Sequence, residues 1–116
     1  GYYVRGFTLN RMGEKERAMK DFLEAVRIDP EQADAHFAIG NAKYHAGNLA
    51  DAVTSYDLAL KARPAMAGAL MNRGVAKAEL NDRAGAIADL TEALRVAPAG
   101  WRSRNDCLDA LRQVEE

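Results

Sequence analysis

Few residues of this 116-residue chain have types and spacings that could do chemistry. The two histidines, His36 and His45, lie nine positions apart, so they cannot place two imidazoles on adjacent turns of one helix, as a zinc pair requires. Cys107 forms no recognisable cluster with them. Ser55 and Ser103 have no evident base to activate a hydroxyl. We therefore expect no metal site and no catalytic residues.

Composition and charge exclude several further classes of function. The glycines are scattered and form no Gly-rich phosphate loop, and no acid/base pair of carboxylates stands out. The net charge is −1, with 16 basic and 17 acidic residues balanced along the chain, so we expect no nucleic-acid surface. No apolar run is long enough to span a bilayer. We expect a non-enzymatic protein that needs no cofactor, binds no nucleic acid and does not insert into membranes.

The lone cysteine bears on location and on reactivity. One thiol cannot form an internal disulfide, which fits a reducing compartment, so we expect a cytoplasmic protein. A secreted or periplasmic location is the alternative. Cys107 lies 34 residues after Arg73, which follows Ile39 and Arg5 at the same interval, and we expect it to lie between helices. We expect it to be an inert, packed thiol, with a reactive one as the alternative. For His36 we expect a packing role, whereas His45 falls near a helix end that faces a groove.

A period of 34 residues organises the chain, because Pro30, Pro64 and Pro98 are separated by that interval. Positions related by this period are called columns here. Four further columns keep the period: Gly6, Gly40 and Gly74; Ala18, Ala52 and Ala86; Ala25, Ala59 and Ala93; and Phe22, Tyr56 and Leu90. Each period reads as two amphipathic helices joined by a tight turn. The expected helices cover 1–12, 15–28, 33–46, 49–62, 67–80 and 83–96.

This pattern resembles the tetratricopeptide repeat. The middle unit carries the resemblance most fully, through Ala33, His36, Ile39, Gly40, Tyr44, Gly47, Ala52, Tyr56, Ala59 and Pro64. The resemblance implies an all-α fold of seven helices, a right-handed α-solenoid of helix-turn-helix hairpins. Residues 1–116 would form one domain, with repeats at 1–32, 33–66 and 67–100 and a capping helix at 101–116. The first residue falls at the third position of its repeat, so we expect an N-terminally truncated first repeat in a longer protein.

The turns and small columns predict the local geometry. Gly47 should end one helix in the left-handed region, and the Asn48 side chain should cap the next helix. Asn81 can replace glycine at the matching turn. The column of Gly6, Gly40 and Gly74 should let the two helices of each hairpin approach closely. The prolines should stop each second helix, because proline disfavours helical dihedrals in its predecessor.

Two pairs of opposite charges vary together between the units. Arg5 lies sixteen residues before Asp21 and Arg73 sixteen before Asp89, whereas the middle unit has Ile39 with Ser55 at the same positions. We expect salt bridges between the two helices of the first and third hairpins. Anion binding by these arginines is the functional alternative.

In the repeat family, partners bind as extended peptides or short helices along the concave face of the first helices, so the resemblance implies a site there. Spacings of three and four predict the following groove residues: Tyr3, Phe7, Asn10 and Arg11; Asp34, Phe37, Asn41, Tyr44 and His45; Met71, Asn72, Val75 and Glu79; and Arg102 and Asn105. Aromatic and Met anchors with a few amides suit peptide capture. In the alternative reading, some of the aromatics pack between helices, or a preceding repeat covers Tyr3 and Phe7.

Some members of the family capture acidic chaperone tails with a clamp of cations and asparagines on three first helices. Here Asn41, Asn72 and Arg102 overlay the clamp, but Phe37 replaces a lysine and Asp106 an arginine, so we do not expect such tails to bind. The predicted function is a protein-protein interaction module that takes a peptide or short helix of an unidentified partner. The alternatives are a structural scaffold that self-associates and a regulatory segment of a larger protein.

Overall fold

The computed structural model describes residues 1–116, and the chain folds into helices alone. The seven helices are α1 (Tyr2–Arg11), α2 (Lys15–Ile28), α3 (Ala33–His45), α4 (Leu49–Ala62), α5 (Ala67–Glu79), α6 (Arg83–Val96) and α7 (Arg104–Glu115). The first six match the expected helices to within one residue at each end. Helix α7 begins three residues later than expected, after a turn. None of the seven is long and apolar enough to cross a membrane.

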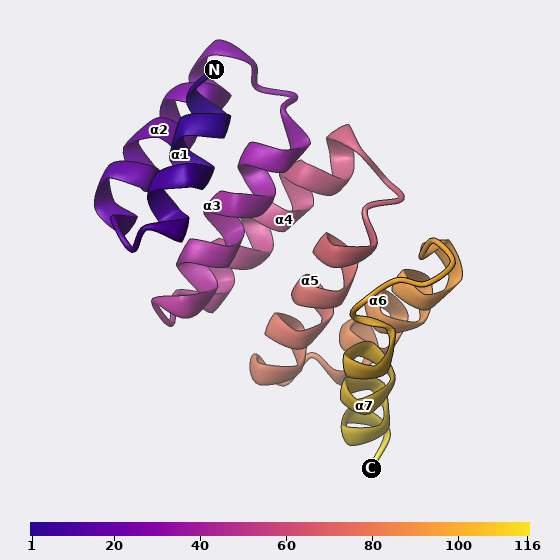
Figure 1. Cartoon of the computed structure of the whole chain (residues 1–116). Coiled ribbons are helices and arrows are strands. Elements are labelled where there is room, and N and C mark those ends of the chain that lie inside the picture. The colour runs from indigo at the N-terminus through magenta and orange to yellow at the C-terminus, as the bar shows by residue number, and fades with distance from the viewer.

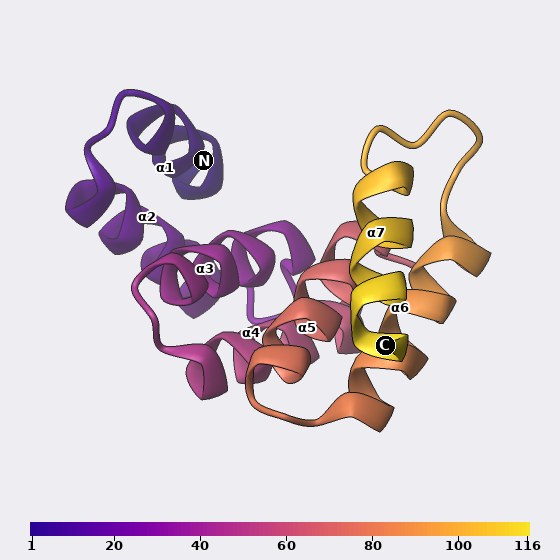
Figure 2. The same cartoon turned by 90° about the horizontal axis from the view of Figure 1, so that it is seen from below.

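Consecutive helices pair into hairpins that stack along one direction (Figure 1). The two chain ends therefore lie at opposite ends of the stack. Viewed along the helices, α1, α3, α5 and α7 follow the inside of an arc, and α2, α4 and α6 follow its outside (Figure 2). The predicted α-solenoid is confirmed, with the first helices of the hairpins on its concave side.

The turns within the hairpins use the left-handed backbone region as predicted. Gly13 (φ 83°), Gly47 (φ 86°) and Asn81 (φ 66°) occupy it. The expected side-chain cap from Asn48 is wrong, because no backbone N–H hydrogen-bonds to that side chain. At the equivalent place Asp82 does cap α6, accepting a hydrogen bond from the Gly85 N–H at 3.0 Å. Both residues start the second helix of a hairpin, but only the carboxylate turns toward the backbone.

Close approach inside each hairpin explains the glycine column. A Cβ placed on Gly40 would lie 2.7 Å from the Tyr56 ring, a separation that real Cβ atoms do not tolerate. The same holds for Gly6 against Phe22 at 2.9 Å. Each glycine therefore makes room for the large residue of its own hairpin, and the two columns work as pairs.

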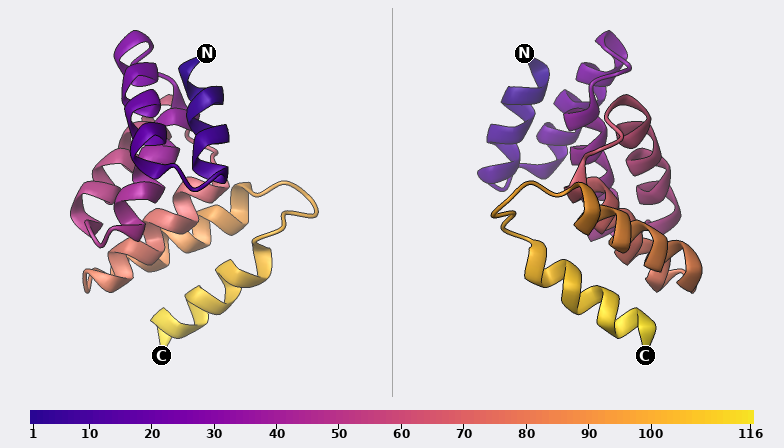
Figure 3. Two further views of the ribbon diagram at one scale, coloured as in Figure 1. Left: turned by 60° about the vertical axis from the view of Figure 1, so that its left-hand side comes forward. Right: turned by 90° about the vertical axis from the view of Figure 1, so that its right-hand side faces the viewer.

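The core consists of two separate clusters. One joins the first two hairpins through Ala18, Phe22 and Ile39. The other runs from α4 to α7 through nine residues, which are Ala52, Tyr56, Ala59, Leu60, Ala69, Leu70, Leu90, Ala93 and Cys107. The second cluster holds the capping helix onto the last hairpin, beyond the loop that links α6 to α7 (Figure 3).

Two of the residues considered for chemistry, Cys107 and His36, are buried and packed inside the fold. Cys107 is fully buried, its thiol lies 3.5 Å from the Leu90 carbonyl, and burial raises its pKa. A thiol in this environment stays protonated and packed. His36 is also buried, and its Nε2 lies 2.8 Å from the Pro30 carbonyl oxygen. The packing roles expected for both residues are confirmed.

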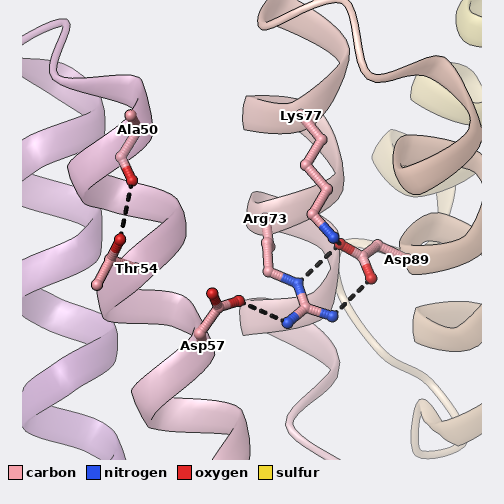
Figure 4. A network of polar contacts seen from close by, with 6 residues as sticks. All are labelled: Ala50, Thr54, Asp57, Arg73, Lys77 and Asp89. Atoms are coloured by element: carbon pink, nitrogen blue, oxygen red, sulfur yellow. Dashed lines mark hydrogen bonds and ion pairs between the residues drawn. The ribbon is translucent and has the colours of Figure 1, made fainter.

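Both predicted salt bridges form between the helices of their hairpins. The Arg5 guanidinium donates to the two Asp21 oxygens at 2.6 and 2.7 Å. Arg73 donates to the two Asp89 oxygens at 2.8 and 2.7 Å and, in addition, to Asp57 of α4 at 2.8 Å (Figure 4). Arg73 therefore ties three helices together.

Candidate functional site

A pocket of about 190 Å³ opens on the concave face between α3 and α5. Its lining comprises Asn41, Tyr44, His45, Tyr56, Asn72 and Val75. Five of these six residues belong to the groove set expected from the sequence, so the fold brings together side chains that lie 34 positions apart in the chain.

A chain of hydrogen bonds fixes the polar wall of this pocket. The Asn41 Oδ1 accepts a hydrogen bond from the Tyr56 hydroxyl at 2.6 Å and another from the Asn72 Nδ2 at 2.8 Å. Burial raises the pKa of Tyr56, so its hydroxyl stays protonated and available as the donor at physiological pH. Both amides are thereby held in one orientation.

Tyr44 lines this pocket, and Glu79 lies beyond it, in the lining of a neighbouring hollow. Hydrogen bonding to the Glu79 carboxylate, together with partial burial, raises the pKa of Tyr44 to about 12. Because Tyr44 lies on α3 and Glu79 on α5, this contact spans neighbouring first helices. Glu79 takes part in no salt bridge and is exposed, so its negative charge faces the groove without a cation.

A second hollow of about 560 Å³ continues the concave face toward the capping helix. Its lining comprises Val75, Ala78, Glu79, Asn81, Arg83, Ala110, Gln113 and Val114. Val75 and Glu79 are the groove residues expected here, and the former is shared with the first pocket. The end of α7 closes the hollow, because Arg83 donates a hydrogen bond to the Glu115 carbonyl at 2.6 Å.

Several predicted groove residues also have partners within the fold. Tyr3 packs on Phe22, with ring centroids 6.0 Å apart, and its pKa is raised by burial. Phe37 packs on Tyr56 at 6.0 Å. Asp34 accepts a hydrogen bond from Arg63 at 3.0 Å. These side chains therefore form the floor and the ends of the concave face and leave the middle to the two asparagines.

The remaining predicted residues lie apart from the two hollows or only at their edges. Phe7 is exposed beside Tyr3, and Met71 is half-buried against the larger core cluster. Four further residues are exposed and line neither hollow, namely Asn10, Arg11, Arg102 and Asn105. The cap contributes Ala110, Gln113 and Val114 instead, since α7 begins late and only its C-terminal half reaches α5.

Tyr56 is the residue of the pocket that the sequence reading missed. It lies on α4, a second helix, and its column reads as core because Phe22 and Leu90 occupy the other copies. The signal that could have found it is the hydroxyl group, which neither of those residues has. A polar atom on an otherwise apolar core column needs a partner, and here that partner is Asn41.

Comparison with protein families agrees with this geometry. A model of the tetratricopeptide repeat matches residues 8–67, and a second one matches residues 67–99. The chain belongs to the tetratricopeptide repeat family. It is 35% identical over 71 residues to human tetratricopeptide repeat protein 6, a match that covers 61% of this chain and 14% of that protein. The chain thus spans only a small part of this curated relative.

Solved structures of similar fold include three complexes with peptides or protein segments. The first domain of Spaghetti (RPAP3) bound to the HSP90 peptide SRMEEVD has a TM-score of 0.84 and 17% identity over 99% of this chain and 91% of that one. The complex of PcrH with the chaperone binding region of PopD gives 0.88 and 19% over 98% and 88%. The TPR2B domain of yeast Sti1 in its pHsp70 complex gives 0.88 and 16% over 98% and 93%. At these identities the likeness shows the tetratricopeptide fold.

Proposed function

We propose that this tetratricopeptide chain is a protein-interaction module that captures an extended peptide segment of a partner protein in its concave groove. The observation that carries the proposal is the Tyr56–Asn41–Asn72 hydrogen-bond chain at the wall of the α3/α5 pocket. The three similar structures with bound peptides or protein segments support peptide recognition by this fold.

The two asparagines offer complementary groups to a peptide backbone. The Asn41 oxygen is occupied by two donors of the chain itself, so its amide hydrogens remain for a ligand carbonyl. Asn72 spends one amide hydrogen on Asn41 and keeps its carbonyl oxygen for a ligand N–H. A peptide backbone lying across both amides could accept a hydrogen bond from Asn41 and donate one to Asn72. These bonds do not depend on the peptide's side chains, and main-chain hydrogen bonds of this kind give extended peptides their affinity.

Side chains around these amides provide the selectivity. Val75 and the ring of Tyr44 give the pocket apolar surface. Glu79, in the lining of the neighbouring hollow, adds a negative charge that takes part in no salt bridge. Phe37 and Asp106 stand where the clamp for acidic tails would have cations. The proposed ligand is therefore an apolar segment with a neutral or basic side chain near Glu79, and not an acidic C-terminal tail.

Capture from a native proteome with single-residue variants tests this proposal. Phe37 packs on Tyr56 and Asn41 accepts two hydrogen bonds, whereas Asn72 donates only one. Asn72→Ala and Glu79→Lys are therefore the better groove variants, each with its thermal melt recorded. Asp51→Lys on the convex helix α4 makes the same charge change as Glu79→Lys and is its control. We expect the same partners to be lost by both groove variants and kept by the control. Partners that survive both groove variants would contradict capture in this groove.

A further inference from the structure

The last residue of each first helix belongs to one column, and Glu79 is the exception in that column. Helices α1, α3 and α5 end at Arg11, His45 and Glu79. A basic side chain is favourable at a helix C-terminus, because the last backbone carbonyls leave a partial negative charge there. A carboxylate at the same end is repelled by that charge. Glu79 therefore does not stabilise its own helix, whereas Arg11 and His45 stand at the end that suits basic residues.

No cation of the fold compensates the charge of Glu79. The side chain is exposed and takes part in no salt bridge. Arg83 lines the same hollow, but its Nη2 donates to the Glu115 carbonyl oxygen at 2.6 Å. The Glu79 carboxylate instead accepts a hydrogen bond from the neutral Tyr44 hydroxyl. Since a carboxylate can accept about four hydrogen bonds, most of this capacity stays open to a ligand.

The surface beside Glu79 suits the stem of a long side chain. The second hollow, between α5 and α7, has a volume of about 560 Å³, and its apolar lining residues are Val75, Ala78, Ala110 and Val114. Lysine and arginine lay their methylene groups along such aliphatic surface while the charged head reaches a polar partner. Glu79 lines the same hollow and supplies that partner.

We propose that the second hollow holds an arginine or lysine side chain of the peptide ligand, with its cationic head paired to the Glu79 carboxylate. This inference rests on the proposed function, since it places one side chain of the captured peptide. Val75 lines both hollows, so a peptide that lies on the Asn72 amide passes beside the second one. The Tyr44 hydroxyl holds the carboxylate in place before the ligand arrives, which lowers the cost of ordering it on binding.

Selection from random peptides displayed on phage tests the proposal without a known partner. We expect the peptides enriched on the native chain to share an arginine or lysine at one position. Synthetic copies in which glutamine replaces this residue should bind about fivefold more weakly, the effect of one exposed ion pair. Isothermal titration calorimetry measures both affinities.

Two matched variants assign that difference to Glu79. Glu79→Gln removes the charge and keeps an oxygen that accepts from the Tyr44 hydroxyl, and on this variant the basic and neutral peptides should bind alike. Asp51→Asn removes an exposed acid of the convex helix α4 that takes part in no salt bridge, and it should leave the fivefold difference unchanged. Equal effects of the two variants would overturn the proposal, because the whole charge of the chain would then attract the peptide.

Asn72→Ala distinguishes failure of this proposal from failure of the proposed function. Selected peptides that this variant weakens but that share no basic residue would overturn the pairing with Glu79 and leave groove capture standing. If Asn72→Ala weakens none of the selected peptides, the proposed groove function is contradicted, and the basic side chain in the second hollow with it.

Discussion

The Tyr56 hydroxyl donates a 2.6 Å hydrogen bond to the Asn41 Oδ1 and so joins a core ring to the wall of the groove. Tyr56 packs against Gly40 and Phe37 below the concave face, whereas Asn41 is half-buried at its surface. The orientation of the groove amides therefore depends on a residue of the second helix.

Tyr56→Phe should remove that donor without changing the packing of the ring. We expect the free energy of unfolding to fall by about 1 kcal/mol, since Asn41 loses one of its two donors in a half-buried place. Chemical denaturation measures this change. Tyr44→Phe removes a hydroxyl at the exposed rim and should cost less. If the two variants lost equal stability, the Tyr56–Asn41 hydrogen bond would contribute no more to the free energy of unfolding than a hydroxyl at the exposed rim.

Asp89 and Asp21 should differ in their contribution to stability. Asp89 accepts two hydrogen bonds from Arg73 and forms an ion pair with the Lys77 Nζ at 3.2 Å. Asp21 accepts hydrogen bonds only from Arg5, whose side chain is mostly exposed. We expect Asp89→Asn to lower the free energy of unfolding by about 2–3 kcal/mol, because it weakens several charged hydrogen bonds at once. Asp21→Asn should cost less, and urea denaturation of both variants compares them. A larger loss for Asp21→Asn would show that exposure does not weaken that pair.

Asp21 also makes stability depend on pH at the acid end. Its hydrogen bond with Arg5 lowers the pKa of this carboxyl from the usual 3.8. A folded-state pKa below the unfolded value contributes stability that is present above 3.8 and lost as the pH falls through the folded value. The stability difference between the native chain and Asp21→Asn should therefore be constant near neutral pH and shrink below 3.8. A difference that stays constant down to the lowest pH of the titration would contradict this.

Gly40→Ala should destabilise the second hairpin by overpacking. The new Cβ would lie 2.7 Å from the Tyr56 ring, and such clashes in a packed core cost about 1–3 kcal/mol. Gly68→Ala is the matched control, since its Cβ would lie 3.3 Å from the tip of the half-buried Phe37 ring. A shift of that ring by a few tenths of an ångström would relieve the contact, so the control should cost less than Gly40→Ala. Thermal unfolding compares the two.

The chain alone should sediment as a monomer. Helix α1 carries Arg5 and Arg11 and no acidic residue, and the C-terminal end of the stack is covered by α7. Sedimentation velocity at increasing concentration tests the scaffold alternative directly. A sedimentation coefficient that rises with concentration would favour self-association.

The 34-residue period was enough to predict the helices, the hairpins and the paired glycine and large-residue columns, because each of these depends on spacing alone. It also predicted the Arg73–Asp89 pair, since both residues depart together from the middle unit. Asn48 shows where this reasoning ends. Asparagine and aspartate are equally good caps by type, so residue type alone does not show that the Asp82 side chain accepts from the backbone and the Asn48 side chain does not.

The groove was predicted in part for a similar physical reason. Helical spacing identifies which residues of a first helix face the concave side, and Asn41, Tyr44 and Asn72 do line its pocket. It does not show what reaches in from another element. Tyr56 comes from α4, and Gln113 and Val114 come from a cap whose late start depends on the loop before it. Contacts of this kind depend on packing between helices, which the period does not encode.

The division of the core into two clusters bears on how freely the sequence can change. Ala18, Phe22 and Ile39 connect the first hairpin only to α3, whereas Tyr56, Leu90 and Cys107 share one cluster that reaches the cap. In a fold where each unit stabilises its neighbours, the effect of a substitution spreads only as far as its contacts. Substitutions in the first hairpin should therefore change the stability of the other units little. A substitution in the α4–α7 cluster affects the packing of all four helices, which carry most of the groove, so its residues can change only together.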